Sequence, residues 1–151
     1  MPTINTKGDL LHTDGIRAFA HGCDVGGAMA SGLSLAFKKR WPAMHEAFSK
    51  RAAEQPLRVG DLVAWTDGTD TVYSLVLQDA PEKPAKMASL ERATQALITR
   101  AIADERLEIA MGRIGAGPAG LDWTRVKKMF VEVTDGTPVS FLVFDKFVRA
   151  K

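Results

Sequence analysis

Cysteine and histidine are scarce in this sequence. One cysteine, Cys23, and three histidines occur among the 151 residues. A single cysteine cannot form an internal disulfide, and histidines scattered at positions 12, 21 and 45 do not supply a structural zinc site. No apolar run approaches the ~20 residues that span a bilayer, and the first residues resemble no secretory signal. We therefore expect a reduced, cytoplasmic setting, without membrane contact or a bound metal.

A strong excess of charge of one sign is also absent. Twenty Lys and Arg face eighteen Asp and Glu, and the resulting net charge of +2 is too weak to indicate a nucleic-acid binder. The chain does contain enough apolar residues, 46%, to bury a core, and it is too short for two ordinary domains. Because no repeat or long linker divides it, residues 1–151 are expected to form a single domain.

Short apolar runs alternate with segments of helical periodicity. Strands are predicted at 16–21, 62–65, 72–77, 107–111 and 139–144, with an opening edge strand at 2–5. Helices are predicted at 32–40 and 43–53 and around the apolar stripes at 90–102 and 126–133. This alternation predicts an α/β fold, a three-layer α/β/α sandwich with a mixed, mostly parallel sheet. The turn at 66–69 predicts one antiparallel hairpin.

Two glycine-rich loops each lead from a predicted strand into a predicted helix. The first covers residues 21–32 and the second 115–120, where Asp122 is placed to cap the next helix. Glycine lets the backbone approach a phosphate closely, and helix N-termini bind anions. The second loop matches G-x-G-x-x-G, but its position near the C-terminus opposes a Rossmann-like, hydride-transferring enzyme. The two loops together favour a phosphate-bearing ligand.

Four motifs in order resemble those of macrodomains. They are Lys7-Gly8-Asp9-Leu10, then His21-Gly22-Cys23-Asp24 with Met29 and Gly32, then Phe37-Lys38-Lys39-Arg40-Trp41-Pro42, and Ile114-Gly-Ala-Gly117 with Gly120-Leu121-Asp122-Trp123. The resemblance extends from Ile4 to about Phe144. It is greatest to the branch that contains terminal ADP-ribose protein glycohydrolases and macrodomain antitoxins that remove ADP-ribose from DNA.

The resemblance implies a pocket for ADP-ribose and no cofactor or metal. Asp9 would accept a hydrogen bond from the adenine amino group, and the two loops would enclose the diphosphate and the distal ribose. Phe144 is a candidate for stacking on the ligand. The implied ligand-binding residues are Gly8, Asp9, Leu10, Gly22, Asp24, Gly27, Ala28, Met29, Ala30, Ser31, Gly32, Leu33, Ile114, Gly115, Ala116, Gly117, Pro118, Ala119, Gly120, Leu121 and Phe144.

The sequence departs from the family's catalytic pattern. Leu77 stands where the closest hydrolases have Lys, Ala119 stands where the protein-directed ones have Asp, and Asp24 replaces the usual Asn. Leucine and alanine cannot perform acid–base or nucleophilic chemistry. A catalytic group shifted to Asp79, Lys83 or Lys86 is one alternative. The other is that His21, with Asp24, supplies the catalytic groups.

Two classes of function therefore remain open. The first is hydrolysis of an ADP-ribosyl linkage by an unusual residue set, or removal of the phosphate of ADP-ribose 1″-phosphate with His21 as the proton shuttle. The second is a noncatalytic reader or sequestering module, which Leu77 and Ala119 favour. The expected partner is ADP-ribose or an ADP-ribosylated macromolecule, with nucleic acid only as such a substrate, and the expected oligomeric state is a monomer.

Overall fold

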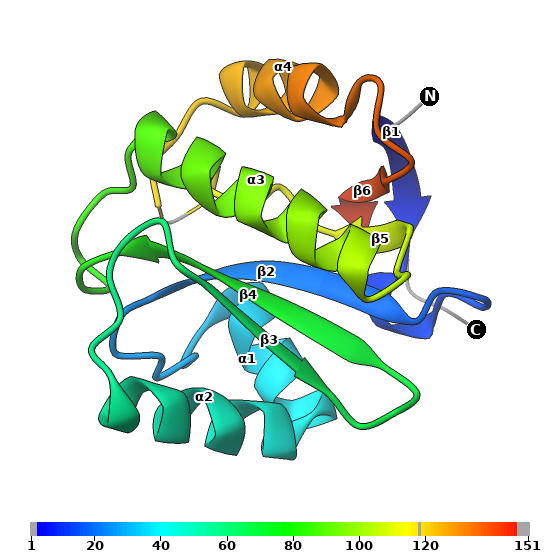
Figure 1. Ribbon diagram of the computed structural model, residues 1–151. Coiled ribbons are helices and arrows are strands. Elements are labelled where there is room, and N and C mark those ends of the chain that lie inside the picture. Colours follow the sequence, from blue (N-terminus) through cyan, green and yellow to red (C-terminus); the bar gives the residue numbers. More distant parts are fainter. Residues whose placement is uncertain (1–2, 118, 148–151) are drawn as a thin grey trace.

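A mixed sheet of six strands forms the centre of the molecule (Figure 1). The computed structural model describes residues 3–117 and 119–147. The strands are β1 (Thr3–Gly8), β2 (Ala18–Asp24), β3 (Leu62–Thr66), β4 (Thr71–Gln78), β5 (Glu108–Met111) and β6 (Ser140–Phe147). The helices are α1 (Gly32–Arg40), α2 (Pro42–Glu54), α3 (Met87–Ala103) and α4 (Trp123–Thr134), with a short 3-10 helix, η1 (Leu10–His12).

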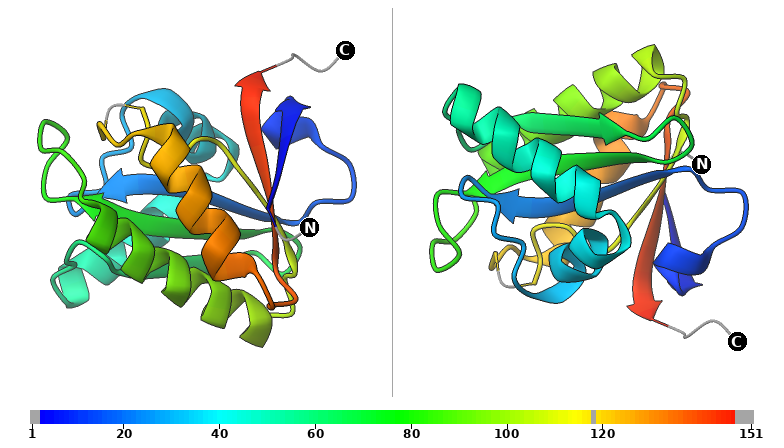
Figure 2. Two further views of the ribbon diagram at one scale, coloured as in Figure 1. Left: turned by 90° about the horizontal axis from the view of Figure 1, so that it is seen from above. Right: turned by 90° about the horizontal axis from the view of Figure 1, so that it is seen from below.

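The strands lie in the order β1-β6-β5-β2-β4-β3, and every neighbouring pair is parallel except β3 with β4. Helices α3 and α4 cover one face of the sheet, and α1 and α2 cover the other (Figures 1 and 2). The predicted three-layer sandwich, the mostly parallel sheet and the antiparallel hairpin are thereby confirmed. Parallel strands direct their carboxyl ends to one edge of a sheet, so the loops that follow β2, β4 and β5 meet there.

The central strands separate two apolar cores. Along β2, Phe19 packs with Phe37 and the other side chains beneath α1 and α2, whereas Ala20 packs with Leu90 beneath α3 and α4. Strand β4 is buried along its length except at Gln78, as expected for a strand covered by helices on both faces. The sequence of β4 is mainly apolar and does not alternate with charged residues, as expected for a strand in this position.

Strand β2 lies later in the chain than the sequence predicted, because the expected strand was 16–21 and the observed strand is Ala18–Asp24. The prediction ended the strand at His21, but pairing with β4 continues through Gly22 and Cys23 to Asp24, which lies opposite Gln78. That end point was wrong because the parallel ladder to β4 continues past His21 and satisfies the backbone hydrogen bonds of the residues that follow. The first glycine-rich loop therefore begins after Asp24.

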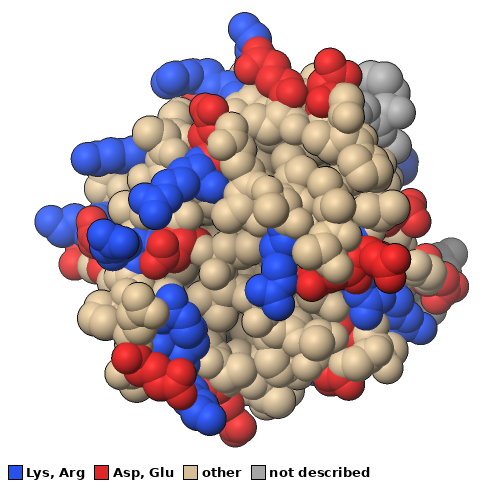
Figure 3. All heavy atoms as spheres, viewed as in Figure 1, with Lys and Arg blue, Asp and Glu red and all other residues tan. Residues whose placement is uncertain are grey.

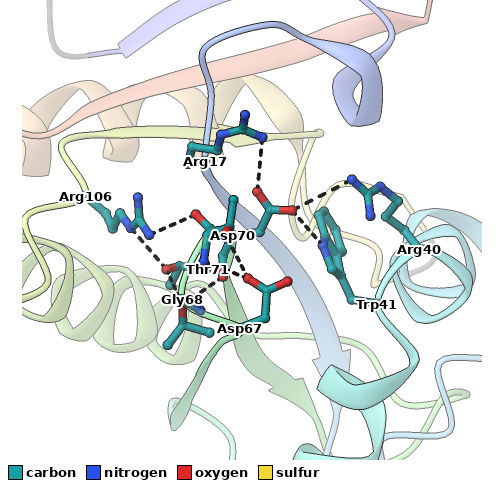
Figure 4. Close-up of polar contacts among 10 residues, drawn as sticks. Arg17, Arg40, Trp41, Asp67, Gly68, Asp70, Thr71 and Arg106 are labelled. Atoms are coloured by element: carbon teal, nitrogen blue, oxygen red, sulfur yellow. Dashed lines mark hydrogen bonds and ion pairs between the residues drawn. The ribbon is translucent and has the colours of Figure 1, made fainter.

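A buried carboxylate, Asp70, fixes the end of the β3–β4 hairpin (Figure 4). The indole Nε1 of Trp41 donates a hydrogen bond to it at 3.1 Å, and Arg17 and Arg40 form ion pairs with it at 3.5 and 3.8 Å. Hydrogen bonds from the amides of Asp70 and Thr69 hold the pKa of the neighbouring Asp67 below its ordinary value. These contacts join the hairpin to the junction between α1 and α2.

Charged side chains of both signs are interspersed over the face of the molecule shown in Figure 3. This mixture agrees with the small net charge of the chain. Within residues 3–117 and 119–147, every helix is too short or too polar to cross a bilayer.

Candidate functional site

A cavity of about 300 Å³ lies at the carboxyl ends of the parallel strands. Its walls come from the end of β2, from the loop that leads into α1, from the end of β4 and from the loop that follows β5. The sequence had assigned most of these segments to a ligand site. The predicted residues that line the cavity are His21, Gly22, Asp24, Ala28, Met29, Ala30, Ser31, Gly32, Leu33, Ile114, Gly115, Gly117 and Ala119.

Other predicted ligand residues lie outside the cavity lining. Near β1, Phe144 of β6 packs against Gly8, where a Cβ would lie 3.3 Å from the ring. Asp9 follows directly, and its carboxylate oxygen Oδ2 lies 2.8 Å from Nδ1 of His12. The described members of this group are Gly8, Asp9, Leu10, Gly27, Ala116, Gly120, Leu121 and Phe144. Pro118 lies outside the described residues.

Asp24 forms a local turn at the cavity wall. Its Oδ1 accepts hydrogen bonds from the amides of Gly26 and Gly27 at 2.8 and 3.1 Å. The amide of Val25 donates to the carbonyl of Gln78 at 2.9 Å, so the loop leaves β2 still attached to β4. Both recorded bonds of the Asp24 side chain use one oxygen, and the residue lines the cavity. Its carboxylate therefore shapes the loop that forms part of the cavity wall.

Side chains from α1 and α2 hold the first loop from outside. His45 Nε2 lies 2.9 Å from the carbonyl of Gly27, and Lys38 Nζ donates to the carbonyl of Ala28 at 3.2 Å. Met29 has φ of +49°, a left-handed conformation that is uncommon for a residue with a side chain, and it is buried. Packing and hydrogen bonds thus fix a backbone shape that the local sequence alone would not adopt.

The N-terminus of α1 opens into the cavity. Its N-cap residue, Ser31, makes no side-chain hydrogen bond to the helix, and Ser31, Gly32, Leu33 and Ser34 all line the cavity. The first amides of a helix have no partner within the helix and carry a partial positive charge. The structure therefore presents donors suited to an anion at this wall.

The cavity floor is apolar where the resemblance places a lysine in related hydrolases. Leu77 is 2% exposed, and a Cβ on Gly22 would lie 2.8 Å from its Cδ1 and 3.4 Å from Ile114. Directly after β5, a Cβ on Gly112 would lie 3.0 Å from Leu33. Glycine is needed at Gly22 because the side chain of Leu77 occupies the adjacent space. At the position of Leu77 the cavity wall therefore offers apolar packing in place of a titratable side chain.

The second loop is folded on itself. Gly115 and Gly120 have φ of +81° and +87°, and the amide of Leu121 donates to the carbonyl of Gly115 at 2.8 Å. Ala119 is buried, and its carbonyl accepts from the amide of Ala85 at 2.9 Å. The predicted cap of α4 is confirmed, because the side chain of Asp122 accepts a hydrogen bond from the amide of Thr124.

His21 is buried between the sheet and α1. Its Nδ1 lies 2.9 Å from the hydroxyl of Ser34, and its Nε2 lies 2.7 Å from the hydroxyl of Ser74. Burial lowers the pKa of His21 to about 3, so the ring is neutral near pH 7. Burial and the charge of Asp24 raise the pKa of the Cys23 thiol. Both residues line the cavity, but near pH 7 the imidazole carries no extra proton to donate and the thiol is not ionised to the nucleophilic thiolate.

Several cavity residues were not assigned from the sequence. Ser34, Gln78, Pro81, Gly112 and Arg113 all line it. Arg113 carries a recognisable signal, because it is a lone cation between a buried strand and a glycine-rich loop. The guanidinium of Arg113 lies over the indole ring of Trp123, 5.5 Å from the ring centroid, and so covers one face of that ring.

Alternative catalytic groups after β4 are not brought to the cavity. Asp79, Lys83 and Lys86 do not contribute to its lining. The side chain of Gln78 donates to the carbonyl of Lys83 at 2.7 Å, which holds this segment beside the strand end. Across the described ranges, no cluster of three or more His, Cys, Asp or Glu is arranged to hold a metal ion.

Comparisons with known proteins agree with this architecture. The family model of the Macro domain matches residues 20–130, which is most of the chain. The protein therefore belongs to the macrodomain family. Over 137 residues it is 27% identical to a "DNA ADP-ribosyl glycohydrolase" of Mycobacterium tuberculosis, covering 87% of this chain and 38% of that protein.

Two further matches cover nearly the whole chain. Human "ADP-ribose glycohydrolase OARD1" is 26% identical over 139 residues, covering 91% of this chain and 88% of the human protein. The macrodomain of Thermus aquaticus DarG superposes with a TM-score of 0.86 at 22% identity, covering 95% of this chain and 97% of the other. This chain spans well under half of the mycobacterial relative, so that protein contains sequence that has no counterpart in the match.

Proposed function

We propose that this macrodomain binds ADP-ribose, or the ADP-ribosyl group of a modified macromolecule, in the cavity at the carboxyl ends of β2, β4 and β5. One observation carries the proposal: two glycine-bearing loops and the uncapped N-terminus of α1 line the same cavity. A diphosphate needs backbone donors that can approach closely, and both kinds of segment supply them. Relatives named as ADP-ribosyl glycohydrolases support the choice of ligand.

The lining chemistry favours binding without turnover. Leu77 and Ala119 are buried apolar groups, and His21 is neutral with both ring nitrogens in hydrogen bonds. Hydrolysis of the ADP-ribosyl linkage is the second candidate function. It is favoured by Asp24, the one carboxylate in the described lining, whose Oδ2 makes no recorded bond to the described residues. That oxygen is the group that would activate a water or attack the anomeric carbon.

Isothermal titration calorimetry with ADP-ribose tests the proposed function. We expect binding in the micromolar range. Product analysis on ADP-ribosylated protein, ADP-ribosylated DNA and ADP-ribose 1″-phosphate then separates the two candidates. Binding without release of product supports the reader, whereas turnover that disappears in Asp24→Asn supports the hydrolase. If ADP-ribose and the modified substrates all fail to bind, the proposal is wrong.

Removing the carboxylate of Asp9 should weaken ADP-ribose binding about tenfold, as expected for loss of a hydrogen bond from adenine to a charged acceptor. The measurement compares parent and Asp9→Ala by calorimetry. Ribose 5-phosphate, which has no adenine, serves as the control ligand. Its affinity, which we expect to be weak, should be the same for the parent and Asp9→Ala proteins. An unaltered affinity for ADP-ribose in a folded Asp9→Ala protein would show that Asp9 does not bind the adenine.

Removing the guanidinium of Arg113 should also weaken binding, by roughly fivefold to tenfold, because Arg113 is a cation at the cavity wall and the ligand carries a diphosphate. The loss should shrink as salt is raised, since part of the attraction is screened. Arg125→Ala is the matched control, because Arg125 is exposed on α4 and does not line the cavity. Equal affinities of the Arg113→Ala and Arg125→Ala proteins at low salt would contradict a role for Arg113.

A further inference from the structure

We propose that His21 is a positioning residue of the ligand site, which holds α1 against β2 through a directional chain of hydrogen bonds and exchanges no proton with the ligand. The chain of contacts runs from Ser74 in β4, through the His21 ring, to Ser34 in the first turn of α1 and back to the carbonyl of Gly22. The predicted effect on ligand affinity rests on the function proposed above. The hydrogen-bond arrangement itself does not.

The distances determine where each proton lies. The hydroxyl of Ser34 donates to the carbonyl of Gly22 at 2.8 Å, so toward His21 this oxygen can only accept. Nδ1 of His21, at 2.9 Å, must then carry the ring proton. A neutral imidazole has one N–H, so Nε2 is bare and accepts from the hydroxyl of Ser74 at 2.7 Å. In this arrangement each N–H and O–H of the chain has an acceptor.

The surroundings favour the neutral ring. His21 is 1% exposed, and its ring centroid lies 4.9 Å from that of Phe37. The alternative acceptor for the proton of the Ser74 hydroxyl is the sulfur of Met44, at 4.0 Å, which is more distant than Nε2 and a weaker acceptor. A charged imidazolium could donate to the hydroxyl oxygens of Ser34 and Ser74, but the Ser74 proton would then be left with the weakly accepting sulfur of Met44. Among the described residues, no carboxylate forms an ion pair with the ring that would offset the cost of burying its charge. The low pKa of His21 has the same physical cause, burial.

The chain of hydrogen bonds connects β2 with the first turn of α1, and the distance between these two parts of the cavity wall determines the shape of the site. Gly22 lies in β2 and Ser34 lies in α1, and both line the cavity. Ser34 follows the uncapped N-terminus of the helix, so its position sets where the free amides at residues 32–34 point. Loss of the imidazole would let the first turn of α1 move relative to β2, and a site that binds through amide donors is sensitive to such displacement.

Nitrogen NMR of the histidine side chains tests the arrangement without any ligand. In protein labelled with ¹⁵N, we expect the His21 ring to be neutral at pH 7, with the proton on Nδ1 and a bare Nε2. Ser34→Ala should alter the Nδ1 signal, and Ser74→Ala should alter the Nε2 signal. A charged ring, or a proton on Nε2, would overturn the proposal.

Substitutions then separate positioning from proton transfer. The amide nitrogen of His21→Asn lies near the place of Nδ1 and can still donate to Ser34, whereas His21→Leu cannot. We expect ADP-ribose affinity within about threefold of the parent for His21→Asn, and at least a tenfold loss for His21→Leu and a smaller loss in the same direction for Ser34→Ala. Thr94→Val is the matched control, because Thr94 is a fully buried hydroxyl residue on α3, away from the cavity.

The outcomes are distinguishable. Equal affinities of the parent and the folded His21→Leu protein would overturn the positioning role. If the parent turns over an ADP-ribosyl substrate, His21→Asn should retain kcat, and loss of kcat at unchanged affinity would assign proton transfer to His21 instead. If the parent binds no ADP-ribose, the proposed function fails, while the NMR result still decides whether the hydrogen-bond chain exists.

Discussion

Gly27→Ala is expected to destabilise the protein by roughly 2–4 kcal/mol, combining backbone strain with overpacking. Gly27 has φ of +62°, and a Cβ built there would lie against the ring of Phe48, one of the fully buried side chains of α2. The ring is held within the core between α1, α2 and the sheet, so it cannot move aside without displacing its neighbours. Urea unfolding followed by circular dichroism measures the effect.

Gly32→Ala is the matched control for this prediction. Gly32 has φ of +59°, nearly the same backbone conformation, but a Cβ there would meet nothing within 4 Å. Its loss of stability should therefore report strain alone, about 1 kcal/mol. The double variant Gly27→Ala with Phe48→Leu should recover part of the difference, because the shorter side chain makes room. Equal losses in the two single alanine variants would show that Phe48 does not restrict the loop.

Lowering the pH from 7.5 to 4.5 should reduce the free energy of unfolding by about 3 kcal/mol through His21 alone. The reason is that, below the pKa of about 6.5 that histidine has in the unfolded chain, each further pH unit costs about 1.4 kcal/mol. The unfolded chain takes up a proton near that pKa, whereas the pKa of the buried ring in the folded protein is about 3. The contribution is complete above about pH 6.5, declines as the pH falls, and is fully lost below about pH 3.

The pH effect is measured as the difference between parent and His21→Asn in urea unfolding at the two pH values. Carboxylates that titrate in the same range affect both proteins equally, so the difference isolates His21. The free energy of unfolding of His21→Asn should fall less on acidification than that of the parent. His12→Asn, at an exposed histidine, controls for the change of residue type. Parallel pH profiles of parent and His21→Asn would contradict the buried, neutral ring.

The order of the strands and helices could be predicted from the sequence because buried strands and helices show local patterns of apolar residues. The mainly apolar segment at 72–77, in which Ser74 is the one hydroxyl side chain besides Tyr73, predicted a strand covered on both faces, and β4 has that environment. The exact ends of the strands were harder to predict. The last residues of β2, from Gly22 to Asp24, pair with a strand far along the chain, and glycine in a local window reads as a break. Long-range pairing decided that boundary.

The candidate site was predicted mainly through its loops. Residues 28–33 and 114–119 were recognisable because the glycines there had a sequence context typical of anion-binding loops, and the structure brings both loops to one cavity. Ser34 and Gln78 gave no comparable signal, since one lies inside a helix and the other ends a strand. The partners of His21 were also hidden, because Ser74 belongs to a neighbouring strand and contacts the ring through the fold alone.

Because Cys23 is buried, a second cysteine introduced on the surface would be the thiol that reacts, and the protein could be attached to a support in one defined orientation. Cys23 is the single thiol of the chain, is 7% exposed, and has a raised pKa, so maleimides should react with it slowly. A cysteine introduced by Thr69→Cys would lie in the exposed hairpin turn, at the amino end of β4 and away from the cavity. Coupling through that thiol would leave the cavity facing the solution, as an immobilised capture reagent requires.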